Sequence, residues 1–114
     1  MNLALRRWKM LRMFFSTDIN KGLREYESTP DAILVDVRER SEFESGHIAG
    51  AINEPLSEIH KTSLPQDKPL FLYCLRGRRS RRAAVILKKM GYTKVESIGG
   101  INGYKGTLVK YKLF

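Results

Sequence analysis

The stretch LFLYCLRGRRS, residues 70–80, decides the fold because it places a continuous apolar run directly before the single cysteine of the chain, Cys74. Such a run, residues 70–73, is typical of a strand buried on both faces of a parallel sheet. A helical pattern follows over residues 80–90, with apolar side chains at i, i+3, i+4 and i+7. Gly91 suits the position after the helix end. The stretch therefore predicts a strand, a short polar loop and a helix.

The same alternation of short apolar runs and helical patterns extends through the chain and predicts an α/β fold with a mostly parallel sheet. Five strands are expected, at residues 13–15, 32–35, 51–53, 70–73 and 95–98. Two further helices are expected, at residues 19–26 and 40–45. Asp18 is the predicted N-cap of the first of these helices, Gly22 is its weak point, and Gly46 closes the second.

The length of 114 residues suits one domain, which we place at residues 13–114. Residues 1–12 form a basic N-terminal segment with Arg6, Arg7, Lys9 and Arg12 and no acid. We expect this segment to be an extra helix packed on the domain; the alternatives are a helix on a membrane surface and an organellar presequence. No apolar run approaches the roughly 20 residues that a membrane-spanning helix needs.

The chain has a net charge of +9, from 21 Lys and Arg against 12 Asp and Glu. A second basic block, residues 76–89, contains no acid and directly follows Cys74. Because no aromatic residue is interleaved with its arginines, a small anionic ligand is favoured over nucleic acid. A single cysteine excludes an intramolecular disulfide and a cysteine-rich zinc site, and we expect neither a metal nor an organic cofactor. A lone functional thiol favours the cytoplasm.

The surroundings of Cys74 predict a reactive thiolate in an electropositive, exposed setting. The cysteine follows a predicted strand and precedes a predicted helix by six residues, so the positive end of the helix dipole faces it. Gly77 permits a tight turn, and backbone amides in such a loop form an anion-binding nest. The same nest would stabilise a persulfide anion. The alternative is a buried, inert cysteine that serves as a small hydrophobe.

Several segments of the chain resemble the rhodanese-like sulfurtransferase family. Residues 74–80 follow the active-site pattern Cys-x-x-Gly-x-Arg/Ser-Ser. The upstream signature of the family is matched by Asp36-Val37-Arg38, Glu42-Phe43 and residues 46–51, GHIAGA. The closing signature is matched by Gly99-Gly100-Ile101 followed by Tyr104. The resemblance covers about residues 14–105.

This resemblance implies a three-layer rhodanese-like fold, in which helices cover both faces of a mostly parallel five-stranded sheet. It also implies a thiosulfate sulfurtransferase that works by a ping-pong reaction. A small anionic donor such as thiosulfate gives its sulfane sulfur to Cys74, and cyanide or a thiol, such as that of a thioredoxin-like protein, removes it. Substrate binding is then expected at Leu75, Arg76, Gly77, Arg78 and Arg79. Structural support of the site is expected from Asp36, Arg38, His47 and Ser80.

Two positions depart from the family pattern. Leu75 stands where many members have a basic residue that binds thiosulfate, so weaker binding of thiosulfate is expected while sulfur carriage is retained. Tyr104 stands where tryptophan is usual, a change in packing that the fold should tolerate. Arg81 and Arg82 are expected to form a solvated helix face, and docking of an acidic partner is the alternative.

Three other functions compete with sulfur transfer to a small acceptor. Cysteine phosphatases and arsenate reductases of related fold use Cys-x5-Arg, whereas Cys74 and Arg79 give Cys-x4-Arg, a loop one residue shorter. A non-catalytic regulatory rhodanese module is a second alternative, although such modules typically lack the cysteine. A persulfide carrier that receives sulfur from a protein donor is the third.

Overall fold

The computed structural model describes residues 17–110, and within them four parallel strands form one sheet. The strands are β1 (Ile33–Asp36), β2 (Ile52–Asn53), β3 (Leu70–Cys74) and β4 (Val95–Gly100), in the order β2-β1-β3-β4. The expected α/β class and parallel sheet are confirmed. The fifth expected strand, residues 13–15, and the basic segment, residues 1–12, lie outside the described residues.

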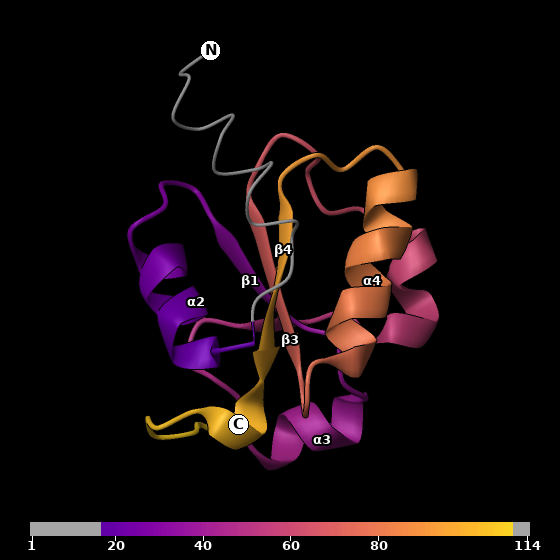
Figure 1. Cartoon of the computed structure of the whole chain (residues 1–114). Helices are drawn as coiled ribbons and strands as arrows, with labels where there is room; N and C mark the ends of the chain where they lie inside the picture. The colour runs from indigo at the N-terminus through magenta and orange to yellow at the C-terminus, as the bar shows by residue number, and fades with distance from the viewer. Residues whose placement is uncertain (1–16, 111–114) are drawn as a thin grey trace.

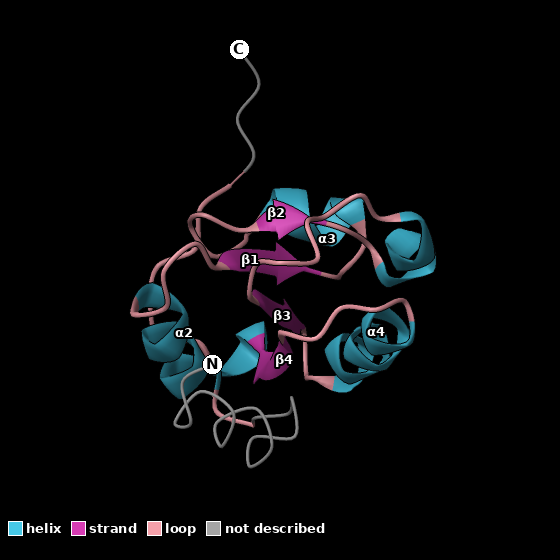
Figure 2. Cartoon of the chain, turned by 90° about the horizontal axis from the view of Figure 1, so that it is seen from above, coloured by secondary structure: helices cyan, strands magenta, loops and turns pink. Residues whose placement is uncertain are grey.

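Helices cover both faces of the sheet, as Figures 1 and 2 show for α2 (Ile19–Glu27) and α4 (Arg78–Lys89). A third helix, α3 (Arg40–Ser45), lies below the end of β3 in Figure 1 and on the side of β1 and β2 in Figure 2. Two 3-10 turns, η1 (Leu56–Lys61) and η2 (Ile101–Gly103), complete the fold. The three-layer arrangement expected from the resemblance is therefore confirmed.

Side chains of β3 alternate between two apolar cores, which is why an uninterrupted apolar run is needed at this strand. Phe71 and Tyr73 pack with Ile19 and Leu23 of α2 in one core. Leu70, Leu72 and Cys74 pack in the other core, with the α4 residues Ala83, Ala84 and Leu87. The thiol thus points to the face of the sheet that α4 covers.

The first helix begins where the sequence predicts, because the Asp18 side chain accepts hydrogen bonds from the backbone N–H groups of Asn20 and Lys21. These hydrogen bonds, that from Lys21 foremost, lower the pKa of the Asp18 carboxyl. Gly22, expected to be a weak point, instead permits close packing. A Cβ at Gly22 would lie 2.4 Å from the Cβ of Ile98, so a larger residue would push α2 away from β4.

The helix after Cys74 begins earlier than expected. Its first residue is Arg78 rather than Ser80, and Gly77 is its N-cap, with φ 99°. The pattern of apolar residues did not reveal this first turn because its side chains are polar. The end of α4 agrees with prediction, since Gly91 follows the C-cap with φ 105°.

None of the helices in residues 17–110 has the length and apolar character needed to cross a membrane.

Candidate active site

The Cys74 sulfur lies in a cradle of backbone N–H groups at the carboxyl end of β3. The N–H of Gly77 donates to Sγ at 3.0 Å, and the N–H of Ser80 donates to it at 3.3 Å. Both donors belong to the amino end of α4, where no preceding turn supplies carbonyl acceptors for them. The positive φ of Gly77 turns the loop back toward the sulfur. We call these two N–H groups the sulfur cradle; they stabilise negative charge on Sγ.

A pair of buried hydroxyls lies behind the sulfur. The Oγ of Ser80 is 3.6 Å from Sγ and donates to the carbonyl oxygen of Gly77 at 3.1 Å. The Oγ of Ser97, on β4, is 2.7 Å from the Oγ of Ser80. Neither serine is exposed to solvent. Ser97 therefore fixes Ser80, and Ser80 joins the sulfur to the turn that forms the cradle.

Gly100 permits the active-site loop to lie directly on β4. A Cβ at this position would be 2.2 Å from the carbonyl oxygen of Leu75 and 2.6 Å from the Cα of Arg76. The same carbonyl oxygen accepts a hydrogen bond of 3.2 Å from the N–H of Asn102. Backbone contacts with Gly100 and Asn102 thus hold the loop in place, and any side chain at Gly100 would break them.

A pocket of about 350 Å³ opens above the sulfur, lined by Cys74, Leu75, Arg76, Arg78, Arg79 and Arg82. Cys74 is only 1% exposed, whereas Leu75 at the mouth is 37% exposed. The prediction of an exposed thiol is therefore wrong. The hydrophobic core cluster on the α4 side includes Cys74, so only a narrow group that reaches into the pocket can meet the sulfur.

Arg79 lines this pocket but is held by Glu42 of α3. Its Nη1 and Nη2 donate to the two carboxylate oxygens of Glu42 at 2.7 and 3.0 Å. The hydrogen bonds from Arg79 lower the pKa of the Glu42 carboxyl, and Glu42 in turn raises the pKa of Arg79. Arg79 is one of the expected substrate-binding residues, but its charge is already paired with that of Glu42.

Asp36 and Arg38 form a buried ion pair at the end of β1. Nη2 and Nε of Arg38 donate to the Asp36 carboxylate at 2.7 and 3.0 Å, and Nη2 also donates to the carbonyl oxygen of Gly46 at 2.7 Å. Burial opposes charge on Arg38, but hydrogen bonds and attraction to Asp36 raise its pKa. Burial, followed by the charge of Asp36, raises the pKa of the Tyr73 hydroxyl. The pair joins the β1 end to the loop after α3.

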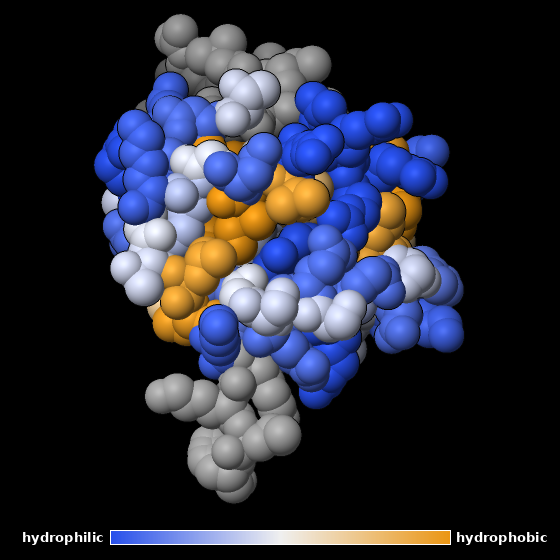
Figure 3. Space-filling view, turned by 90° about the horizontal axis from the view of Figure 1, so that it is seen from below, coloured by the Kyte–Doolittle hydropathy of each residue, from blue (hydrophilic) through white to orange (hydrophobic). Residues whose placement is uncertain are grey.

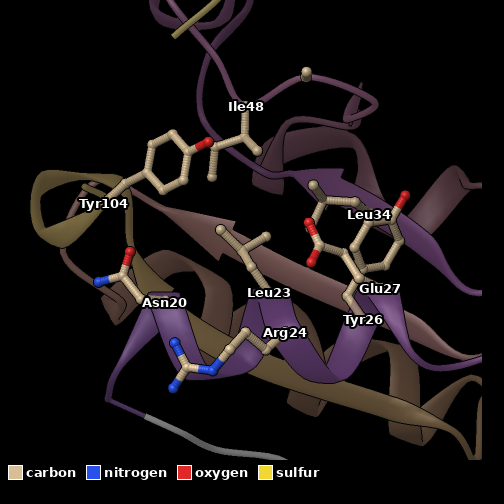
Figure 4. Close-up of a pocket in the computed structure, with 9 residues that line it drawn as sticks. Asn20, Leu23, Arg24, Tyr26, Glu27, Leu34, Ile48 and Tyr104 are labelled. Carbon is tan, nitrogen blue, oxygen red and sulfur yellow. The ribbon is translucent and has the colours of Figure 1, made fainter. Parts of the chain in front are cut away.

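His47 and Tyr104 lie away from the sulfur pocket. The Nδ1 of His47 is 2.7 Å from the carbonyl oxygen of Phe43, and the two rings stack with centroids 3.7 Å apart. Tyr104 lines a second pocket of about 290 Å³ on the α2 side of the sheet, opposite Leu23 and beside Ile48 (Figure 4). Neither His47 nor Tyr104 lines the pocket above Cys74.

Comparison with known proteins identifies the family of the chain. The profile of the rhodanese-like domain matches residues 20–107.

The chain belongs to the rhodanese family.

Two curated relatives and one solved structure illustrate the relationship. The chain is 49% identical over 76 residues to an uncharacterized protein of Bacillus subtilis, YqhL, covering 65% of this chain and 59% of that one. It is 41% identical over 71 residues to the thiosulfate sulfurtransferase PspE of Escherichia coli, covering 59% and 68%. The structure of a rhodanese with anions from E. coli has a TM-score of 0.63 and 34% identity, covering 70% and 99%. The chain therefore spans less than two thirds of YqhL.

Sequence reasoning missed three residues of this rhodanese site. Arg82 lines the sulfur pocket because it follows Arg78 by four residues and so lies on the same side of α4, a spacing that the sequence does contain. Glu42 was noted only as part of a motif, although it pairs with Arg79. Ser97 gave no signal, since only the pairing of β3 with β4 brings it to Ser80.

Proposed function

We propose that this rhodanese is a sulfurtransferase that moves sulfane sulfur from an anionic donor such as thiosulfate to a thiophilic acceptor through a persulfide on Cys74. The observation that carries the proposal is the sulfur cradle, in which the N–H groups of Gly77 and Ser80 meet Sγ at 3.0 and 3.3 Å. The similarity to PspE, named a thiosulfate sulfurtransferase, supports the same chemistry. The lone thiol suits a reducing compartment such as the cytoplasm.

In the first half-reaction the Cys74 thiolate attacks the outer sulfur of thiosulfate. A bond forms between Sγ and that sulfur, the sulfur–sulfur bond of thiosulfate breaks, and sulfite leaves with the electron pair. The terminal sulfur then carries the negative charge at the amino end of α4, where the helix dipole favours an anion. In the second half-reaction, cyanide or a thiolate attacks the terminal sulfur and Cys74 leaves as the thiolate.

The loop length supports sulfur rather than phosphate as the bound group. From Cys74 to Arg79 the loop has six residues, one fewer than in the Cys-x5-Arg enzymes. Arg79, the arginine that would bind a tetrahedral oxyanion, is paired with Glu42 on both of its terminal nitrogens. The cradle N–H groups point at Sγ itself. The site therefore favours a negatively charged sulfur at Cys74 over a phosphate group bound above the thiol.

A persulfide carrier with a protein donor is the second candidate function. Leu75 at the pocket mouth is 37% exposed and apolar, so it offers a thiosulfate dianion no charge. The cradle would hold a persulfide equally well whatever its source. This candidate differs from the first only in the donor, and the same experiment separates them.

The test is intact-mass measurement of the chain after incubation with thiosulfate, followed by addition of cyanide. We expect a gain of one sulfur atom that cyanide removes as thiocyanate, and no gain in Cys74→Ser, which remains folded. A gain from inorganic polysulfide but not from thiosulfate would favour the carrier. Thiocyanate formation by Cys74→Ser at the wild-type rate, or turnover of an aryl phosphate faster than sulfur transfer, would refute the proposal.

A further inference from the structure

The mouth of the sulfur pocket carries more positive charge than a small donor needs. Arg76, Arg78 and Arg82 line the pocket and are exposed, and Arg81 lies next to them on α4. Within residues 17–110 the side chains of these four arginines make no ion pair, since the pairs there involve Arg38, Arg40 and Arg79. We call Arg76, Arg78 and Arg82 the basic rim.

Repulsion among these positive charges destabilises the fold, and the binding of a small substrate does not explain why so many of them are present. The block of residues 76–89 contains no acid, so the arginines repel one another along one side of the pocket. A thiosulfate dianion deep in the pocket would neutralise two charges, and the helix dipole already favours it. Arg82 is about one turn along α4 from Arg78, so the basic lining of the pocket extends beyond the first turn of the helix, which forms the sulfur cradle.

The rim also borders apolar surface. Leu75 is 37% exposed at the mouth, and Figure 3 shows an apolar band beside the blue, hydrophilic surface at this end of the molecule. An apolar contact beside arginines fits a protein interface, which has a more apolar core and a polar rim and in which Arg is enriched. Nucleic acid is disfavoured because no aromatic side chain lines the pocket.

The burial of the sulfur limits the shape of a partner. Because Cys74 is 1% exposed beneath the rim, a thiol that lies flat on a folded surface cannot reach it. A cysteine on an extended loop or tail can enter a pocket of about 350 Å³ while its neighbouring residues cross the rim.

We propose that the basic rim docks an acidic protein segment, extended at its cysteine, that exchanges sulfur with Cys74. This inference rests on the proposed function and names the partner of the same site. In the exchange toward the segment, its thiolate attacks the terminal sulfur of the Cys74 persulfide. The new sulfur–sulfur bond forms on the segment, the bond to Sγ breaks, and Cys74 keeps the electron pair, so no external oxidant or reductant is needed.

The test uses two synthetic peptides with one central cysteine, flanked on both sides by glutamates in one and by glutamines in the other. The full chain is loaded with inorganic polysulfide, the gain of one sulfur is verified by mass, and the rate of sulfur transfer to each peptide is measured. The deciding quantity is the rate of sulfur transfer to the glutamate peptide divided by the rate of transfer to the glutamine peptide. We expect a ratio of about ten at low salt, which falls toward one near 1 M salt, where charges more than about 3 Å apart are screened.

A matched pair of variants assigns the ratio to the rim. Arg82→Glu should reduce the ratio to about one, whereas Lys89→Glu, the same charge change on exposed surface near the other end of α4, should keep it above about five. A ratio near one in the wild type, or equal ratios in the two variants, would overturn the inference. So would stronger inhibition of transfer by a single-stranded RNA than by a cysteine-free glutamate peptide of equal charge. Failure of Cys74 to gain sulfur would instead refute the proposed function.

Discussion

Replacing Gly100 by alanine tests whether the backbone of the active-site loop creates the sulfur chemistry. The added Cβ would lie 2.2 Å from the carbonyl oxygen of Leu75 and 2.6 Å from the Cα of Arg76. Both atoms belong to the backbone, so no change of rotamer can relieve the contact. The loop and β4 must separate by about 1.2 Å before the nearest pair reaches an ordinary contact of 3.4 Å.

A shift of this size is large compared with the hydrogen bonds of the cradle. If residues 75–77 moved by about 1.2 Å, the 3.0 Å contact from the Gly77 N–H to Sγ would lengthen beyond the range of a useful hydrogen bond. A hydrogen bond to a charged group contributes about 1.5–3 kcal/mol, so losing one weakens the stabilisation of negative charge on the sulfur by a factor of about 10 to 150. Overpacking itself costs about 1–3 kcal/mol of stability.

The assay is the rate of alkylation of Cys74 by iodoacetamide at pH 7, since the chain has no other thiol. We expect Gly100→Ala to react at least about tenfold more slowly than the wild type, because the displaced loop no longer donates its hydrogen bond to the sulfur. Gly103→Ala is the matched control, because its Cβ would lie 3.9 Å from Ile19, an ordinary contact. A folded Gly100→Ala protein that reacts within twofold of the wild type at pH 7 would refute the reasoning.

Three further predictions concern the side chains around the cradle. Leu75→Arg should lower the KM for thiosulfate by about tenfold through a new charge-assisted hydrogen bond, measured by steady-state thiocyanate formation at two salt concentrations. Glu42→Gln should lower the free energy of unfolding by about 1 kcal/mol at pH 7. Because Arg79 lowers the Glu42 pKa, that difference should hold above pH ~4.3 and vanish as acid protonates the wild-type carboxylate, measured by denaturant titration. Ser97→Ala should slow the alkylation of Cys74 at pH 7 while Tm falls only slightly, because Ser80 loses its 2.7 Å partner.

The parts of this fold that the sequence predicted are those set by local pattern. The apolar run before Cys74 predicted β3 because both faces of that strand are buried, and the capping side chain of Asp18 predicted the start of α2. The predicted start of α4 was wrong by two residues, because the first turn of the helix presents polar side chains. The N-cap of the helix is Gly77, which has no capping side chain.

The parts that could not be predicted depend on contacts between distant segments. Helix propensity makes Gly22 a weak point of α2, but a Cβ there would meet Ile98 of β4, and no local pattern brings these two residues together. The burial of Cys74 follows from the packing of α4 and η1 on β3, whereas the surrounding arginines alone suggested an exposed thiol. The pairing of Arg79 with Glu42 joins α4 to α3, and no spacing within either helix reveals it.

In the proposed reaction, the site separates the holding of sulfur from the choice of partner. Holding depends on backbone, namely two N–H groups at the start of α4 and the close approach of the loop to Gly100. Partner choice depends on the exposed side chains of Leu75 and the basic rim. These side chains do not supply the hydrogen bonds that stabilise charge on Sγ, which come from the backbone. Substitutions at the rim should therefore change the rate with one acceptor relative to another, while substitutions that move the backbone should reduce transfer to every acceptor alike.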